Sequence, residues 1–97
     1  MGVILRTTRK IKWGKMAEYR ALHDKLDARW RALGQAPLKA HYQIMGANTV
    51  VADREWESLA AFEASGPTLN TDPELVALRP ALYELIEDQE WQFLISM

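Results

Sequence analysis

His23 is the side chain of this sequence best suited to acid–base chemistry. Asp27 follows it by four residues, so on a helix the carboxylate can hydrogen-bond one ring nitrogen and fix the tautomer needed by a general base. The same spacing is common for a histidine that simply borders an apolar helix face and has a helical hydrogen-bond partner. We therefore predict His23 with Asp27 as the best catalytic candidate, with a boundary histidine as the alternative.

Aromatic and basic side chains indicate a pocket for a small apolar or aromatic molecule. The chain has four tryptophans in 97 residues, and such side chains line pockets as well as cores. Arg54 alternates with Trp56 on a predicted strand, where it would hold a carboxylate or phenolate, or else form a salt bridge with an acid such as Glu90. His41 would either contact the ligand or line the sheet. The predicted ligand-binding residues are Tyr19, His23, Trp30, His41, Arg54 and Trp56.

Several chemistries lack their required residues. Without cysteine there is no disulfide, thiolate metal site or cysteine nucleophile, and this composition fits the cytoplasm. Two unrelated histidines and an aspartate make a poor zinc or iron site, so we expect no metal. No phosphate loop, nucleophile elbow or dinucleotide fingerprint occurs, so we expect no cofactor. The apolar run at residues 3–5 is too short for a signal peptide, and no stretch could span a membrane.

The first half of the chain contains the patterns of a strand, a helix and a hairpin. Residues 2–12 are rich in β-branched side chains, which predicts a strand. Residues 15–33 repeat apolar side chains at helical spacing, which predicts a helix of about 19 residues. Residues 38–45 and 49–56 predict two strands joined by a turn at residues 46–48.

The second half contains two helical patterns and a last strand. Ser58 predicts the N-cap of a short helix over residues 59–64, followed by a break at 65–67 and a loop to residue 71. Asp72-Pro73-Glu74 is typical of a second helix start. We expect Pro80 to kink that helix or to split off its first turn.

Residues 90–97 predict the closing strand, with Trp91 in the core beside Phe93 and Ile95. The order strand, helix, strand, strand, helix, strand predicts an α+β, ferredoxin-like βαββαβ fold over residues 1–97, a single domain. Its antiparallel four-stranded sheet would carry both helices on one face.

The other sheet face would then be bare, yet the strands place apolar side chains on both faces. Ile4 lies between Val3 and Leu5, and Val50 is adjacent to Val51. Burying both faces requires a partner, most simply an identical sheet in a two-fold homodimer. The alternative is a monomer with scattered exposed apolar residues.

Charge is distributed unevenly along the chain. Residues 1–47 hold ten Lys and Arg against three Asp and Glu, and residues 48–97 hold two against ten, so the halves carry +7 and −8. A basic half is typical of nucleic-acid or anionic-membrane binding. In the predicted sheet, however, basic side chains of the first strand face acids of its neighbours, and residues 49–55 lack the aromatic run that stacks RNA bases. We therefore expect no nucleic-acid or membrane partner.

A set of short motifs extends along nearly the whole chain: Leu5-Arg6-Thr7, Gly14-Lys15-Met16, Glu18-Tyr19, Asn48-Thr49-Val50-Val51, Trp56-Glu57-Ser58-Leu59 and Asp72-Pro73-Glu74. In their order and spacing, these motifs resemble those of NIPSNAP-type domains in the dimeric α/β-barrel superfamily. The resemblance implies homodimerisation through the sheets and a pocket between each sheet and its own helices.

The same superfamily includes cofactor-independent monooxygenases, haem-degrading enzymes and small lactone isomerases. Haem-degrading relatives carry an iron-binding histidine on the second helix, and residues 58–88 of this chain contain none. From the candidate pocket residues together with this resemblance, we expect a homodimer that binds a small apolar or aromatic molecule and acts on it as a cofactor-independent monooxygenase or isomerase. The alternative is a non-catalytic dimerisation or assembly protein.

Overall fold

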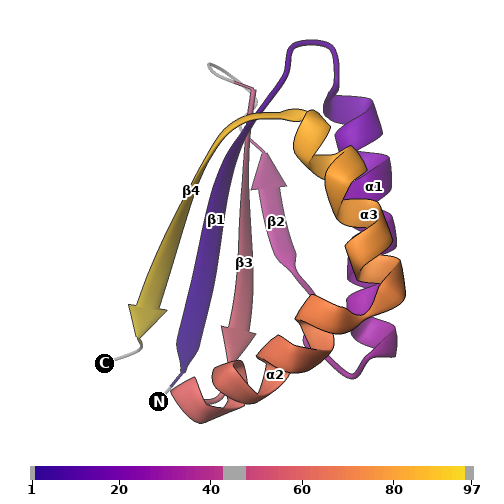
Figure 1. Cartoon of the computed structure of the whole chain (residues 1–97). Helices are drawn as coiled ribbons and strands as arrows, with labels where there is room; N and C mark the ends of the chain where they lie inside the picture. The colour runs from indigo at the N-terminus through magenta and orange to yellow at the C-terminus, as the bar shows by residue number, and fades with distance from the viewer. Residues whose placement is uncertain (1, 43–47, 96–97) are drawn as a thin grey trace.

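Within residues 2–42 and 48–95, which the computed structural model describes, the chain forms one four-stranded sheet and three helices (Figure 1). The elements are β1 (Val3–Ile11), α1 (Met16–Ala32), β2 (Lys39–Tyr42), β3 (Thr49–Trp56), α2 (Leu59–Thr71), α3 (Pro73–Glu84) and β4 (Ile86–Ile95). The strand order is β2-β3-β1-β4, and every neighbouring pair is antiparallel. The predicted ferredoxin-like fold is confirmed, with α2 and α3 together taking the place of the second helix.

All three helices lie on the same side of the sheet. Helices α1 and α3 run side by side, and α2 crosses from the end of β3 toward the helical layer (Figure 1). Alternate residues of β1 and β3 point toward the helices and supply the strand side of the core. The buried apolar cluster consists of Ile11, Tyr19, Leu26, Val50, Trp56, Leu69, Leu75, Leu82 and Leu85.

The predicted first strand and first helix are confirmed to within about one residue at each end. Gly14 turns the chain between β1 and α1 with a positive φ of 77°, a conformation that only glycine adopts at little cost. Gly34, with φ of 82°, follows α1 and donates its N–H to the carbonyl of Arg31. A glycine in the left-handed region directly after the last turn is a common way for a helix to end.

Helix α2 is longer than predicted, because it continues through the expected break and loop to Thr71. The Ser58 cap is confirmed, since its Oγ accepts the N–H of Ala61 at 3.1 Å. Pro67 deprives the Glu63 carbonyl of its usual helical donor, but Glu63 is exposed and water can replace the donor. Burial of Leu69 against the core favours the helical conformation beyond the proline.

Helix α3 begins as predicted, with the Asp72 carboxylate accepting the N–H of Leu75 at 3.1 Å and Pro73 in the first turn. The same carboxylate accepts two hydrogen bonds from Arg29, at 3.0 and 2.7 Å, which ties α3 to α1. The expected split at Pro80 is wrong, because α3 continues through it to Glu84. The carbonyl that loses its donor belongs to Val76, which is 46% exposed and therefore accessible to water.

The last strand starts four residues earlier than predicted, at Ile86, and its described part ends at Ile95. Residues 43–45 of the predicted second strand, and residues 46–47 of its turn, lie outside the described residues. The prediction of Trp91 as core is wrong for the single chain, since Trp91 is 57% exposed. Among the described residues, β4 makes few contacts with α3 and fewer with the other helices, so the indole is left largely uncovered.

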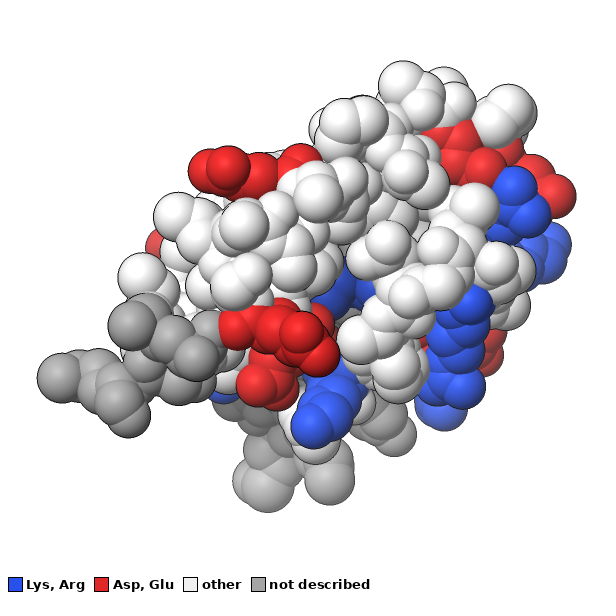
Figure 2. Space-filling view, turned by 90° about the horizontal axis from the view of Figure 1, so that it is seen from below, with Lys and Arg blue, Asp and Glu red and all other residues white. Residues whose placement is uncertain are grey.

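Acidic and basic side chains are paired within the fold. Arg6 donates to both carboxylate oxygens of Asp53 across β1 and β3, each at 2.9 Å, and Lys10 lies opposite Asp88 on β4. Seen from below, both signs of charge occur close together on the surface (Figure 2). The predicted cancellation across the strand pairs is present for these residues.

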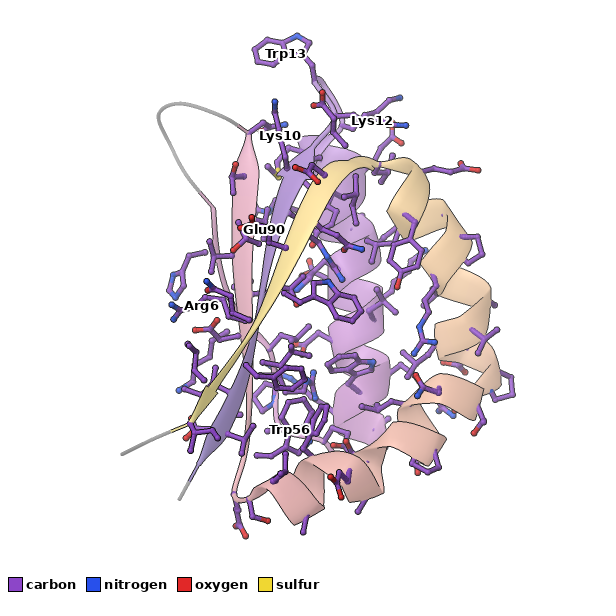
Figure 3. All side chains as sticks on the ribbon, turned by 60° about the vertical axis from the view of Figure 1, so that its left-hand side comes forward. Arg6, Lys10, Lys12, Trp13, Trp56 and Glu90 are labelled. Carbon is purple, nitrogen blue, oxygen red and sulfur yellow. The ribbon has the colours of Figure 1, made fainter. Side chains whose placement is uncertain are left out.

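The sheet face away from the helices is mixed in character. Arg6 points away from the helices while Trp56 points toward them (Figure 3). By strand register, Ile4 and Leu94 lie opposite each other on the helix-free face, and Val51 lies opposite Thr8. Each of β1, β3 and β4 therefore contributes one aliphatic side chain to this face, and charged groups surround them.

Candidate functional site

A cavity of about 350 Å³ lies between the sheet and the helices. Most of its wall is apolar or aromatic, and its aromatic members are Trp30, Trp56, Phe62, Tyr83, Trp91 and Phe93. Tyr83 on α3 and Trp91 and Phe93 on β4 line the cavity and are each about half exposed, so the cavity opens between α3 and β4. A space of this size suits a ligand of two or three fused rings.

Aromatic contacts connect α2 to two strands in the wall of this cavity. Phe62 of α2 meets Trp56 of β3 edge-to-face at 4.9 Å and Phe93 of β4 at 5.0 Å between ring centroids. Helix α2 thus bridges two strands that are separated by β1 in the sheet. An apolar ligand entering from the α3–β4 side would meet these three rings.

Arg54 is the polar residue buried deepest in the cavity wall. It is 1% exposed, and its guanidinium carbon lies 3.3 Å from the centroid of the Trp30 ring. Among the described residues, its Nε, Nη1 and Nη2 have no hydrogen-bond partner. The alternative of a salt bridge to Glu90 is wrong, because Glu90 pairs with Thr8 and so lies on the helix-free face. A buried guanidinium without an acceptor is costly, and a bound ligand would relieve this cost.

Two further buried nitrogens share this wall. The Nε2 of His23 and the Nε1 of Trp30 also lack partners within the part of the chain that the structure describes. Both residues come from α1 and line the cavity together with Arg54. Unpaired polar atoms are rare inside proteins, so a group of five among the described residues of one cavity makes this cavity the candidate binding site.

Burial lowers the pKa of both basic groups, Arg54 and His23. Loss of solvent lowers the pKa of Arg54 to about 9, and the Asp27 carboxylate only partly opposes this. Burial also lowers the pKa of His23, with the charges of Asp27 and Asp24 opposing and that of Arg9 adding to the effect. His23 is therefore a neutral imidazole at pH 7 and can accept a proton.

The helical spacing predicts a hydrogen bond between His23 and the Asp27 carboxylate, but the carboxylate has other partners. Its Oδ1 accepts the N–H of Leu38 at 2.9 Å, and its Oδ2 pairs with Arg31 Nε at 3.1 Å. The carboxylate thereby fixes the segment that leads into β2. The carboxylate nearest His23 is that of Asp24, 4.0 Å from Nδ1, which is beyond hydrogen-bond distance. The predicted His23–Asp27 pair is thus replaced by these contacts, and Asp27 acts on His23 only through its charge.

Four of the six predicted ligand residues line the cavity: His23, Trp30, Arg54 and Trp56. Tyr19 is buried beside it, with its ring 5.9 Å from that of His23 and its hydroxyl accepting a hydrogen bond from Arg9 at 3.1 Å. His41 lies elsewhere, because it pairs with Val51 and so belongs to the helix-free face.

Sequence reasoning missed two arginines of the cavity wall, Arg9 and Arg79. The signal for Arg9 was present, because strand alternation places it on the same side of β1 as Leu5 and Thr7. Arg79 could not be found this way, since its helical position alone does not show that its side chain reaches back to the carbonyl of Leu69.

A second hollow, of about 400 Å³, lies beside the helix-free face and is a weaker candidate. Its charged members are Lys39, Asp53, Glu55 and Glu57. Asp53 is already paired with Arg6, and no polar side-chain atom of the described lining is both buried and unpartnered. Nothing in this hollow therefore requires a ligand.

Within residues 2–42 and 48–95, no three His, Cys, Asp or Glu side chains come together in a way that could hold a metal ion. None of the described helices has the length and apolar character to cross a membrane.

The fold and the cavity define the class of protein, a ferredoxin-like α+β protein with a pocket between its sheet and its helices. No protein-family model matches the sequence, and no curated protein matches it either. Solved structures, in contrast, include proteins similar to this chain. A NIPSNAP family protein from Agrobacterium tumefaciens has a TM-score of 0.83 and 24% identity, covering 100% of this chain and 94% of that chain.

Two further structures extend the comparison. A NIPSNAP domain protein from Burkholderia xenovorans has a TM-score of 0.82 and 26% identity, covering 100% of this chain and 95% of that one. SnoaB, a cofactor-independent oxygenase from Streptomyces nogalater, has a TM-score of 0.76 and 18% identity, covering 98% and 92%. The predicted resemblance to NIPSNAP-type proteins is confirmed, and the fold is shared with a cofactor-independent oxygenase.

Proposed function

We propose that the protein binds a small apolar or aromatic molecule in the sheet–helix cavity and acts on it as a cofactor-independent monooxygenase or isomerase. The observation that carries this proposal is the Arg54 guanidinium, which is buried in a cavity lined by aromatic rings and has no hydrogen-bond partner among the described residues. Ligand binding explains why such a group is kept. Because the sequence has no cysteine, we place this activity in the cytoplasm.

Proton abstraction is the step that both reactions share. His23 is neutral, and its Nε2 has no other partner among the described residues, so it would take a proton from an acidic carbon of the substrate. The arginines of the cavity wall would stabilise the negative charge that remains. In an isomerisation His23 returns the proton to another carbon.

In an oxygenation the substrate carbanion is oxidised by dioxygen, which serves as the only co-reactant. A methylene group becomes a carbonyl, one oxygen atom enters the product, and the other leaves as water with the two hydrogens of the methylene. Atoms and electrons balance without a flavin or a metal. SnoaB, which shares this fold, is a cofactor-independent oxygenase.

We further propose a homodimer formed through the helix-free face of the sheet. Ile4, Val51 and Leu94 supply aliphatic side chains there, and no helix of the described chain covers them. Sedimentation at micromolar concentration should give a dimer, and Leu94→Asp should shift it toward monomer because it would bury a charge between the sheets. A wild-type monomer would contradict this part of the proposal.

Tryptophan fluorescence tests the binding. Trp13 is 93% exposed and projects away from the cavity, so Trp13→Phe removes a background signal without touching the site (Figure 3). Anthrone and its 2-carboxylate, tricyclic ketones with an acidic methylene, should quench the remaining tryptophans in a saturable way. Absence of quenching would favour the alternative, a non-catalytic dimerisation or assembly protein.

Oxygen uptake tests the chemistry with the same two compounds. The protein should accelerate their oxidation above the buffer rate, and His23→Gln should reduce the acceleration roughly 100-fold or more. Binding without acceleration would retain the cavity as a ligand site and remove the oxygenase.

A further inference from the structure

The charged side chains of the described residues that line the sheet–helix cavity are all basic. Arg9, Arg54 and Arg79 are on its wall, and none of the described lining residues is Asp or Glu. The whole chain has a formal net charge of −1, so this positive wall does not reflect composition. A concave, water-poor wall of one sign attracts ligands of the opposite sign.

Two of these arginines are already engaged. Arg9 donates to the Tyr19 hydroxyl at 3.1 Å and to Gln89 at 3.3 Å, and Arg79 donates to the carbonyl of Leu69. Arg54 has no such partner among the described residues. Among the described wall residues, Arg54 therefore has the one guanidinium whose N–H groups are all available.

The geometry of Arg54 restricts what can pair with it. One face of its guanidinium is stacked on the Trp30 ring, so the N–H groups remain available around its edge, in the guanidinium plane. An acceptor with two coplanar oxygens fits this edge by two parallel hydrogen bonds, which is the pairing of arginine with a carboxylate. The Nε1 of Trp30, on the ring that contacts the guanidinium, has no partner in the described part of the chain and is one more donor in the same cavity.

The rest of the cavity selects the body of the ligand. Trp56, Phe62 and Phe93 form a contiguous group of rings, and Phe62 meets both others edge-to-face. These rings offer flat apolar surface but no group that would hydrate a dianion such as a phosphate monoester. A ligand with a single negative charge on an aromatic ring system matches both the Arg54 guanidinium and the group of aromatic rings.

We propose that the ligand of this cavity is an aromatic monocarboxylate, whose carboxylate accepts the paired N–H groups of Arg54 and whose rings pack among Trp56, Phe62 and Phe93. This inference rests on the proposed function, because it assigns a ligand class to the same cavity. In this assignment Arg54 determines the specificity of the cavity for an anion. A neutral ligand of the same shape leaves the guanidinium unpaired and binds more weakly.

Isothermal titration calorimetry with 2-naphthoate and 2-naphthamide tests the anion requirement, because the two compounds differ in charge and have nearly the same shape. The wild-type protein should bind naphthoate at least tenfold more tightly than naphthamide. Arg54→Met should weaken naphthoate binding at least tenfold and abolish the preference. Arg54→Lys, which keeps the charge and loses the fork, should give an intermediate affinity.

Arg31→Met is the matched control, since it removes the same charge from an exposed side chain that pairs with Asp27 outside the cavity. It should leave naphthoate affinity within twofold of the wild type, and circular dichroism should show all variants folded.

The outcomes separate this inference from the proposed function. Equal wild-type affinity for the two compounds, or an Arg54→Met variant that keeps the preference, overturns the carboxylate inference and leaves the cavity as a site for neutral aromatic ligands. Failure of the wild-type protein to bind either compound overturns both. Loss of naphthoate binding in Arg31→Met as large as in Arg54→Met would show a general charge effect and would also overturn the role of Arg54.

Discussion

Replacing Arg54 by methionine should stabilise the ligand-free protein. Burial lowers the pKa of Arg54 to about 9, more than three pKa units below its ordinary value. At about 1.4 kcal/mol per pKa unit this corresponds to roughly 5 kcal/mol of unfavourable free energy in the folded state at neutral pH. The contact with the Trp30 ring offsets ~2 kcal/mol of it. Methionine, which is apolar and also long and flexible, should therefore raise the unfolding free energy by about 3 kcal/mol.

Urea unfolding at pH 7.5, followed by circular dichroism, measures this difference directly. In a domain of this size about 3 kcal/mol should also raise the melting temperature by roughly 10 °C or more. Arg54→Lys should show little of this gain, because burying a lysine ammonium, or removing its proton, costs a similar free energy.

The pH dependence gives a second test of the same reasoning. The pKa of Arg54 is lower in the folded than in the unfolded state, so the unfolded state binds more protons above pH 9. The penalty is fully present below about pH 9 and is relieved as the pH rises further. The stability gap between Arg54→Met and the wild type should be constant from pH 7 to about 9 and shrink above it. A variant less stable than the wild type at pH 7.5 would refute the reasoning and show that Arg54 has partners in solution.

Two further predictions concern titratable groups. Asp72 caps α3 and accepts hydrogen bonds from Arg29, whose guanidinium lowers the pKa of the Asp72 carboxyl. The stability that this carboxylate contributes should therefore be lost below about pH 4. Asp72→Ala should lower the urea midpoint more than Asp72→Asn, because asparagine keeps a capping oxygen. Equal midpoints for these two variants would contradict a capping role. Burial lowers the pKa of His23, so the free energy of unfolding should fall as the pH drops below about 6.5. His23→Gln should abolish this pH dependence. An NMR titration midpoint for His23 at or above about 6.5 would contradict the prediction.

The stability prediction and the binding prediction describe one trade-off. Arg54 destabilises the empty protein and strengthens binding of an anion, so Arg54→Met should be more stable and less active. Active sites commonly retain groups that are unfavourable without their ligand. A variant that gained stability and kept its affinity for naphthoate would separate the two effects and leave the buried guanidinium without a function.

Local patterns determined most of the secondary structure. The 3- and 4-residue spacing of apolar residues gave α1, and Ser58 and Asp72-Pro73 gave the starts of α2 and α3, because caps and periodicity act within a few residues of chain. The passage of α2 through Pro67 could not be read locally. It depends on the burial of Leu69 against elements distant in the sequence.

The same division holds for the site. Residue type and strand alternation were enough to select Arg54 and Trp56, and helix periodicity was enough to select His23 and Trp30. Their partners were not predictable, because strand register decides which groups meet. Register puts Glu90 on the face opposite Arg54, and the loop before β2 uses the Asp27 carboxylate that helical spacing assigns to His23. Sequence alone thus determined which groups could do chemistry, while the tertiary structure decided which of them remain unpaired, since pairing depends on contacts between distant segments.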